Sequence, residues 1–466
     1  MIIKNRNVLL SHGNVAGRRI VLDIMEAGLT APDPYENTKK VVRLENGKLI
    51  LGHPDFSQPP GQEPVVYHLK DIRSIYVVGG GKAAQKMAKG LEDALGDLIT
   101  TGQVNAKKGE SVILKRINVT LAGHPIPDSD SVTGAARILE IEKGAREGDI
   151  VFWLNSGGGS ALKALPAPGI MLEDLQEIYR ILYFGCGASM PEANAVRNLL
   201  TVVREKHPKH VRGATLVQLL TNELPRRLRV HMPAAASTNE YERAIQVLNK
   251  YHIWDKVPQS VRTFLSKADP AYLRPTPDEL KQRPYYIYQV MGPEYLIDAA
   301  EAKAREMGLN TTVLATSLND VEAKPVGSII AAIAQEAEVL GRPLKPPCVF
   351  LCGGEVVVPI GQETGVGGRN QELVLAAAAR IAGSDNIVIG SVDSDGTDGP
   401  TDVAGGIVDG LTAERIRQSG FDLAEEINRH NSNPILRALN DTIFTGNTGN
   451  NVRDLRVIYV SQSQSG

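Results

Sequence analysis

Two stretches of this 466-residue chain repeat one local pattern, in which a short apolar run is followed by a glycine turn and then by a helix-forming segment. The run Ile75–Val78 leads into Gly79–Lys82 and the helical pattern Ala83–Leu95, and the run Ile150–Leu154 leads into Asn155–Ser160. Strand, turn and helix in this order are typical of a parallel α/β sheet, whose ligands bind at the carboxyl ends of the strands. The pattern predicts a Rossmann-like N-terminal domain.

The chain has 466 residues, which is more than one hydrophobic core usually serves. Beyond residue 290 the same alternation returns, with a helix expected over Glu294–Met307 and a strand over Cys348–Leu351. We therefore expect two α/β domains, an N-terminal one over residues 1–280 and a C-terminal one over residues 281–466. The apolar run 455–460 predicts a late strand that is able to join either sheet.

Composition argues against two classes of partner. With a net charge of −2, the chain has no electrostatic reason to bind nucleic acid or an anionic membrane. No apolar stretch reaches the roughly 18 residues of a membrane helix, and the three cysteines Cys186, Cys348 and Cys352 lack metal-ligand spacing. We expect a cytoplasmic protein that acts on a small molecule. Its oligomeric state stays open, with a homo-oligomer among the alternatives.

The first glycine turn, Gly79–Lys82, formally matches the G-x-G-x-x-A fingerprint of dinucleotide-binding proteins through Ala84. That fingerprint also requires an acidic residue for the ribose at the end of the next strand, but the region Thr101–Lys108 contains none. A lysine within the turn instead favours a phosphate held between an ammonium group and the N-terminus of a helix. The alternative is a tight structural turn with an exposed lysine.

The second turn, Ser156–Ser160, contains three consecutive glycines, whose N–H groups can form an anion-binding nest to which the serines add hydroxyl donors. It matches neither a Walker A loop nor the elbow of the hydrolases. Between the two turns, His124 lies in a stiff loop with Pro125 and Pro127. His124 is a candidate for substrate contact. The alternatives are a flexible loop at Ser156–Ser160 and a histidine that is merely hydrogen-bonded.

A third segment, with a helical pattern, places Asn194 and Arg197 three residues apart and therefore on one face of the helix. An arginine in this position can bind a carboxylate through its planar, permanently charged group. An arginine that forms a surface salt bridge is an equally good interpretation.

Two stretches in the C-terminal half, 353–372 and 393–402, combine glycines, one arginine and several carboxylates next to apolar runs. Glycines let the backbone approach a ligand closely, and Arg369 offers a charged fork to an anion. The carboxylates can hold a metal or accept a proton. This inventory is typical of phosphate chemistry. Simple turns with solvated aspartates explain a cluster of this density less well.

These segments resemble, in order along nearly the whole chain, the glycerate 2-kinase family that carries the MOFRL C-terminal domain. Some members of that family are named hydroxypyruvate reductases. The most specific matches lie in the C-terminal half. The matching segments are Val77–Ala84, Gly123–Pro125, Ser156–Leu162, Asn194–Arg197, Gly353–Glu355, Gly367–Glu372, Asp395–Asp402 and Thr445–Asp454.

The resemblance implies a two-domain α/β enzyme, with its active site in the cleft, that transfers the γ-phosphoryl group of ATP to the 2-hydroxyl of glycerate. Lys82 and Arg369 would stabilise the transferring phosphoryl group. Mg is the expected metal, with Asp395 as the residue that binds it or accepts a proton, and Asp398 as an alternative or additional ligand. The residues expected to bind substrate or phosphate are Gly79, Gly80, Gly81, His124, Ser156, Gly157, Gly158, Gly159, Ser160, Asn194, Arg197, Glu355, Asn370 and Glu372.

Departures from the family pattern lie in the middle of the chain, at His207–Leu216, Thr221–Glu223, Ala235–Thr238 and Met291–Pro293. They allow three interpretations, which are an altered acceptor, a changed nucleotide preference and a lost activity. Beside the kinase there are therefore two alternatives, a nicotinamide-dependent reductase of the hydroxypyruvate type and a catalytically silent metabolite-binding protein. The missing ribose-binding acid counts against the reductase.

Overall fold

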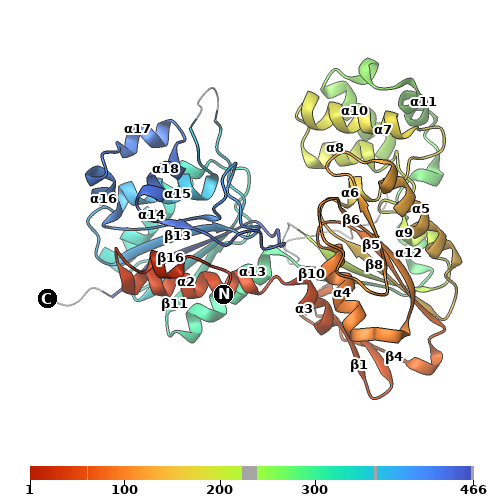
Figure 1. The fold of residues 1–466 in the computed structure, drawn as a ribbon, viewed down its shortest axis with the longest axis horizontal. Coiled ribbons are helices and arrows are strands. Elements are labelled where there is room, and N and C mark those ends of the chain that lie inside the picture. Colours follow the sequence, from red (N-terminus) through yellow and green to blue (C-terminus); the bar gives the residue numbers. More distant parts are fainter. Residues whose placement is uncertain (60, 223–238, 361–364, 463–466) are drawn as a thin grey trace. The chain divides into compact units, whose positions relative to one another are not determined.

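The computed structural model describes residues 1–59, 61–222, 239–360 and 365–462. The chain divides into two compact units (Figure 1). Unit 1 contains Met1–Asp33, Asn222 and the described residues from Met291 onward. Unit 2 contains Pro34–Thr221 and residues 239–290. Both units are α/β, so the expected fold class is confirmed.

Unit 2 contains a seven-stranded sheet in the order β3-β10-β9-β8-β5-β6-β7. The four pairings that join β9, β8, β5, β6 and β7 are parallel, whereas β3 pairs with β10 in the antiparallel sense. The Rossmann-like parallel sheet predicted for the N-terminal half is therefore present. Its strands are β3 (Ser57–Gln58), β5 (Ser74–Gly80), β6 (Ile99–Lys107), β7 (Asn118–Ala122), β8 (Asp149–Asn155), β9 (Thr215–Thr221) and β10 (Tyr285–Met291).

Local sequence explains the central elements of this sheet. Strand β8 is apolar along most of its length and is buried on both faces, as expected for an inner strand of a parallel sheet. Helix α5 (Ser129–Gly144) begins with a capping box, in which the Asp128 carboxylate accepts the Ser131 N–H and the Ser131 hydroxyl accepts the Asp128 N–H. Helix α4 (Ala84–Leu95) follows the first glycine turn directly.

The remaining elements of unit 2 form a small antiparallel sheet and a helical cluster. In the cluster, α7, α8, α10 and α11 share one apolar core, and Figure 1 shows them gathered together. The sheet strands are β1 (Val42–Glu45), β2 (Lys48–Leu51) and β4 (Val65–His68). The helices are α3 (Pro34–Val41), α6 (Gly159–Leu162), α7 (Leu172–Arg180), α8 (Met190–Arg197), α9 (His207–His210), α10 (Glu240–Lys250), α11 (Gln259–Lys267) and α12 (Pro277–Lys281).

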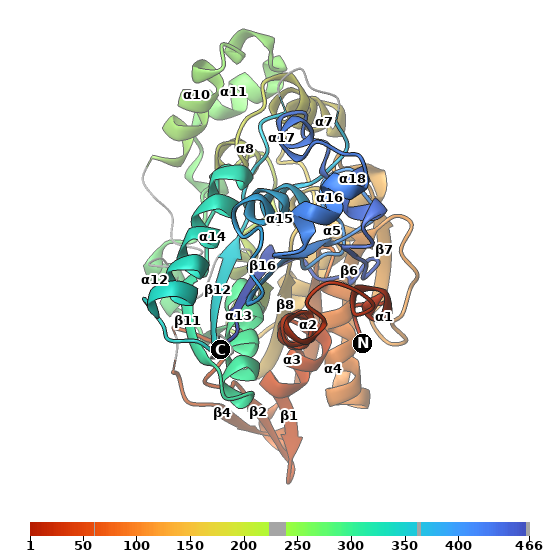
Figure 2. The same cartoon turned by 90° about the vertical axis from the view of Figure 1, so that its left-hand side faces the viewer.

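Unit 1 contains a six-stranded mixed sheet in the order β11-β12-β16-β13-β14-β15. Helices α14 and α15 pack on one face of this sheet, and α2 and α13 lie together on the other face, beside β16 (Figure 2). The strands are β11 (Asn310–Ala315), β12 (Cys348–Gly354), β13 (Ile387–Asp393), β14 (Gly405–Asp409), β15 (Thr442–Ile443) and β16 (Asp454–Val460). The helices are α1 (Arg6–Leu9), α2 (Val15–Thr30), α13 (Pro293–Glu306), α14 (Ala323–Leu340), α15 (Arg369–Arg380), α16 (Thr412–Gln418), α17 (Leu423–Asn428) and α18 (Ser432–Ala438).

The structure divides the chain differently from the two expected domains. The expected N-terminal domain included the first 33 residues, but Met1–Asp33 belongs to unit 1, and the later boundary falls at 290/291 rather than at 280/281. The last strand, for which either sheet was open, joins the sheet of unit 1. It lies between β12 and β13 and is antiparallel to both. Local pattern identifies such elements, but long-range packing decides which sheet they join.

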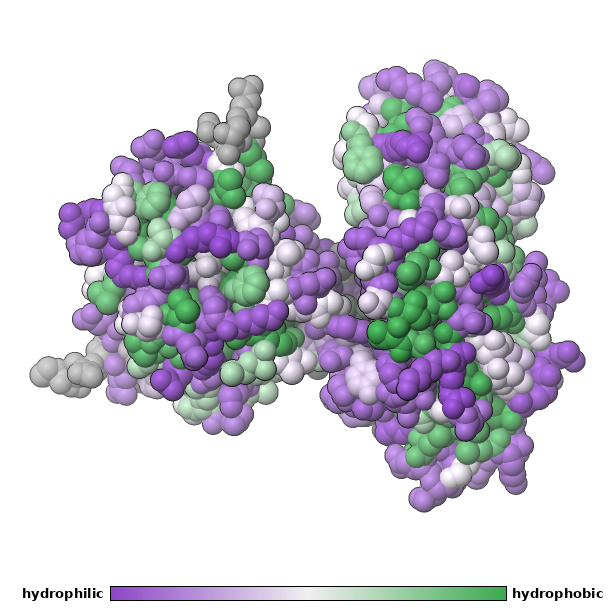
Figure 3. Space-filling model, in the orientation of Figure 1, coloured by the Kyte–Doolittle hydropathy of each residue, from purple (hydrophilic) through white to green (hydrophobic). Residues whose placement is uncertain are grey.

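Several smaller expectations can be compared with the structure. Cys348 and Cys352 are buried, as expected of strand thiols, and burial raises the pKa of Cys348 to about 11. Within the described ranges, no helix is both long and apolar enough to cross a bilayer. Figure 3 shows polar side chains interspersed with apolar ones over the visible face of both units. The altered positions at 223 and 235–238 lie outside the described residues.

Candidate active-site residues in the two units

The two glycine turns of unit 2 are joined to each other by hydrogen bonds. Strands β5 and β8 are parallel neighbours with Gly80 opposite Asn155, so both turns leave the same edge of the sheet. The Lys82 N–H donates to the Gly157 carbonyl over 2.9 Å, and the Ala83 N–H donates to the Ser156 hydroxyl over 3.1 Å. The two turns therefore lie side by side at the ends of neighbouring strands.

His124, in the loop after β7, lies next to the second of these glycine turns. Gly158 has a φ of +84°, and a Cβ on it would lie 3.1 Å from the His124 ring and 3.5 Å from Cγ of Lys82. A side chain at Gly158 would therefore be strained and would contact both residues. The structure thus brings together Lys82, His124 and the Ser156–Ser160 turn, three candidates that come from separate parts of the sequence.

The surroundings of His124 are strongly cationic. Burial, followed by the charges of Lys82, Lys107 and Arg197, lowers the pKa of His124 to about 4, so its imidazole is neutral at physiological pH. Within the part of the chain that the structure describes, no carboxylate forms an ion pair with any of these three cations. Such a cluster suits an anionic ligand. Lys107 was not among the candidates predicted from the sequence. Its position at the end of β6 could have identified it as a site residue.

Asn194 and Arg197 share one face of α8, as predicted. Arg197 is fully buried and donates to the Asn194 side-chain oxygen and to the Tyr183 hydroxyl, and its guanidinium lies 4.7 Å from the Tyr179 ring centroid. The Tyr179 hydroxyl in turn donates to the Ser160 carbonyl over 2.8 Å. The surface salt bridge considered for Arg197 is therefore absent from the described residues. Through Tyr179, the arginine is linked to the second glycine turn.

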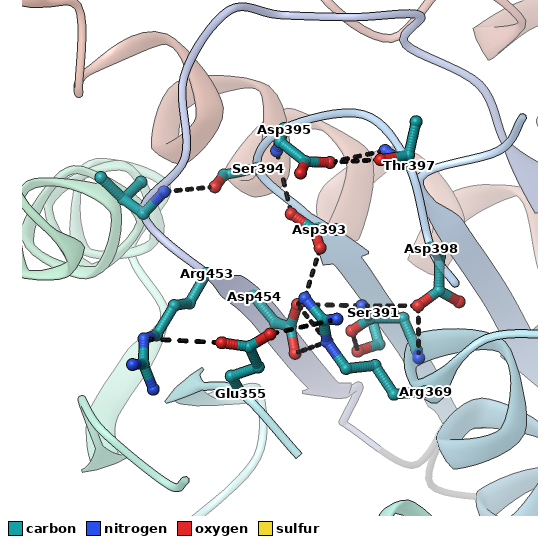
Figure 4. A network of polar contacts seen from close by, with 12 residues as sticks. Glu355, Arg369, Ser391, Asp393, Ser394, Asp395, Thr397, Asp398, Arg453 and Asp454 are labelled. Carbon is teal, nitrogen blue, oxygen red and sulfur yellow. Dashed lines mark hydrogen bonds and ion pairs between the residues drawn. The ribbon is translucent and has the colours of Figure 1, made fainter. Parts of the chain in front are cut away.

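Arg369 is the centre of the polar network in unit 1 (Figure 4). Its Nε donates to both carboxylate oxygens of Asp454 over 3.0 and 3.1 Å, its Nη2 pairs with Asp393, and its Nη1 lies 3.3 Å from Glu355. Burial acts to lower the pKa of Arg369, but Asp454, Asp393 and Glu355 outweigh it and the pKa is raised. The charge of Arg369 is thus offset by three carboxylates.

The register of β16 produces this network. Asp454 begins β16 and lies opposite Gly354 at the end of β12 and opposite Asp393 at the end of β13. Arg456 donates to Asp454 over 2.7 Å. Burial, followed by the Asp454 charge, raises the pKa of Asp393 well above its usual range. Sequence reasoning missed Asp393 and Asp454 as site residues, because their meeting depends on where β16 inserts.

The two aspartates proposed as metal ligands have different environments. Asp398 is fully buried and accepts the N–H groups of Asn370 and Gln371 over 3.0 and 2.9 Å, together with both of their side-chain amides. It caps the N-terminus of α15, and both of its oxygens are occupied. Asp395 uses one oxygen, Oδ1, to accept the N–H and hydroxyl of Thr397, both over 2.8 Å. Asp395 therefore fits a metal better than Asp398.

Across the described ranges, no group of three or more His, Cys, Asp and Glu side chains is arranged to hold a metal. Of the other predicted residues, Asn370 is buried and bonded to Asp398, Asp454 and Ser391, and Glu372 is buried and bonded to His430. Their direct contact with substrate is not supported. Glu355 remains 41% exposed.

The fold and these sites define a two-unit α/β protein with cation-lined glycine turns at strand ends, the architecture of enzymes that handle anionic substrates. Residues 20–266 match a family described as a domain of unknown function (DUF4147), and residues 348–454 match the MOFRL family. The chain belongs to the glycerate 2-kinase family that combines these two domains.

Three similar proteins define this relationship. The glycerate 2-kinase of Pyrococcus horikoshii is 36% identical over 459 residues, which cover 96% of this chain and 99% of that protein. The D-glycerate 2-kinase of Thermotoga maritima is 38% identical over 390 residues, 83% of this chain and 90% of that protein. The crystal structure of a glycerate kinase from Thermotoga maritima has a TM-score of 0.79 at 31% identity and covers 95% of this chain and 99% of that one.

Proposed function

We propose that this protein is an ATP-dependent kinase that phosphorylates a hydroxyl of glycerate or a related hydroxy acid. The observation that carries the site assignment is the cluster of Lys82, Lys107 and Arg197, which has no carboxylate partner among the described residues. Catalysis of phosphoryl transfer depends mainly on positioning the phosphoryl group and stabilising its negative charge, and such a cluster can do both. The family relationship supports the same chemistry.

Each part of the unit 2 site then has a role. Lys82 stabilises the transferring phosphoryl group, and the Ser156–Ser160 turn holds phosphate or carboxylate oxygens through its backbone N–H groups. Arg197 is fully buried and held by Asn194, so it adds positive charge behind the second turn through Tyr179 rather than touching the acid itself. His124 is neutral at physiological pH and exchanges a hydrogen bond with the substrate without adding charge.

For unit 1 we propose a revised role for Arg369. Its ion pairs with Asp393, Asp454 and Glu355 leave little net positive charge for a phosphoryl group, so Arg369 chiefly fixes the positions of these acids. Asp395 binds Mg or accepts the proton of the acceptor hydroxyl, and Glu355 is the other carboxylate exposed enough to contribute. Mg, when bound, would neutralise charge on the phosphates of ATP.

The reductase is the weaker candidate because β6 ends in Lys107, where a ribose-binding acid would be required. We also propose that the protein works in the cytoplasm on a small-molecule substrate. That residues of both units act in one active site, as the resemblance implies, stays a prediction.

A screen for ATP consumption over a panel of sugar acids, with Mg present, tests the proposal. The expected result is ADP formation that depends on one acid and on Lys82. Hydroxypyruvate-dependent oxidation of a nicotinamide cofactor without ADP formation would instead support the reductase. Calorimetric binding of ATP and an acid without turnover would support a silent metabolite-binding protein.

A further inference from the structure

Lys163 is a buried lysine directly below the two glycine turns. It follows α6, and its N–H donates to the Gly159 carbonyl over 3.0 Å. Only 2% of the residue is exposed, and no carboxylate in the described ranges forms an ion pair with it. Its Nζ lies 5.9 Å from the centroid of the Trp153 ring, so a cation–π contact accompanies a buried charge that has no ion pair of its own.

The aliphatic part of Lys163 packs against both turns. A Cβ on Gly80 would lie 2.8 Å from its Cγ, and a Cβ on Gly159 would lie 3.2 Å from its Cε. Both glycines therefore lie against the same lysine, one from each turn. The turns also touch each other directly, because a Cβ on Gly159 would lie 2.9 Å from the Gly80 carbonyl oxygen.

Two further buried groups, Glu142 and His207, lie close enough to Lys163 to interact with its charge. Glu142 and His207 are fully buried and bonded to each other. Burial raises the pKa of Glu142 well above its usual range, while burial and the Lys163 charge lower the pKa of His207. Burial, opposed by Glu142, lowers the pKa of Lys163 to about 8, and the other charged neighbours are Arg204 and Glu205.

We infer that Lys163 is a positioning residue of the anion site, which packs against both glycine turns and places a positive charge behind them, where it stabilises the phosphates of bound ATP at long range. This rests on the proposed function. Lys163 acts through the turns, and the turns themselves contact the ligand.

Lys206 offers a matched control, because it is a second buried lysine in unit 2. Its Nζ donates to the Asn198 carbonyl over 2.7 Å and to the Thr201 carbonyl, and only 2% of the residue is exposed. Lys163→Met keeps most of the packing volume and removes the charge. We expect it to raise the dissociation constant for ATP, and for inorganic pyrophosphate as a probe, on the order of tenfold to a hundredfold.

In steady-state kinetics, Lys163→Met should raise the KM for ATP and leave the KM for the acid within about twofold. Lys206→Met should lower stability and leave the ATP affinity of the folded protein within about twofold. Unchanged ATP affinity in Lys163→Met, or an equal loss in Lys206→Met, would overturn the inference. If Lys82→Ala also binds ATP as wild type does, the proposed phosphate site itself fails. If only Lys82→Ala loses affinity, the role of Lys163 alone fails.

A measurement on the wild-type protein keeps the inference testable should Lys163→Met not fold. A bound anion favours the charged form of Lys163, so ATP binding at a pH above 8 should take up a proton. Calorimetry at pH 8.5 in two buffers of different ionisation enthalpy measures this uptake, which we expect to be about half a proton or more. Binding of ATP without proton uptake would contradict the inference.

Discussion

Replacing Asp454 by alanine should destabilise unit 1 strongly, because this buried carboxylate holds two arginines. Asp454 has no exposed side-chain surface and accepts hydrogen bonds from Arg369, Arg456 and Asn370. Arg456 is fully buried as well, so Asp454→Ala would leave it without its carboxylate. Removing one partner of a buried ion pair costs about 3–5 kcal/mol. For a unit of this size, that corresponds to a fall in Tm of roughly 6–20 °C.

Asp402→Ala is the matched control, since Asp402 is 70% exposed and pairs with Arg437, which is 46% exposed. An exposed pair contributes about 1 kcal/mol at most. Calorimetric unfolding of both variants and of wild type gives the comparison. The double variant Asp454→Ala, Arg369→Ala should be less destabilised than the sum of the single variants, because the unpaired charge is partly removed with its partner. A loss of less than about 1 kcal/mol in Asp454→Ala would refute the reasoning.

Three further predictions concern pH, substrate and ligand coupling. Burial and three nearby cations lower the pKa of His124 to about 4 in the folded protein. When the pH falls below about 6.5, the ordinary pKa of histidine, the unfolded chain therefore binds a proton at His124 before the folded chain does. The free energy of unfolding should therefore fall as the pH drops from about 6.5 toward 4. In pH-dependent denaturation, this fall should be smaller for His124→Asn than for wild type. D-glycerate should be a poor acceptor, because Pro293, in one of the segments that depart from the family pattern, offers no backbone donor at the start of α13. A kcat/KM for D-glycerate of roughly 10⁵ M⁻¹s⁻¹ or above would count against this. A non-hydrolysable ATP analogue and the acid together should raise Tm by more than the sum of their separate effects, as expected when the two ligands favour each other's binding in one active site. In thermal unfolding, a rise no larger than that sum would contradict it.

The parts of the site that lie close to the repeated strand–turn–helix pattern could be predicted from the sequence. Parallel strands end at the same edge of a sheet, so Gly79–Lys82 and Ser156–Ser160 could be expected to meet, and they do. The pairing of Asn194 with Arg197 followed from helical spacing alone. These inferences needed only local geometry.

The rest depended on long-range packing. No local sequence pattern indicates that β16 inserts between β12 and β13. The contacts of Asp454 with Asp393 and Arg369 were therefore not predicted. The same limit applies to Met1–Asp33, whose helix α2 packs beside β16. Burial was the other missing quantity. Asp398 looked like a metal ligand by its residue type, yet it caps α15 with both oxygens occupied.

The most direct test of the central claim is the turnover of Lys82→Ala with ATP, Mg and the best acid from the screen. Lys82 is exposed and lies at the cationic turns, so its loss should leave Tm near that of wild type. Removal of a group that stabilises transition-state charge should lower kcat on the order of 10²–10³. Lys82→Arg should not restore the rate, because a planar fork does not replace a compact ammonium group in a tight turn. Near-normal turnover in Lys82→Ala, with the protein folded, would contradict the account.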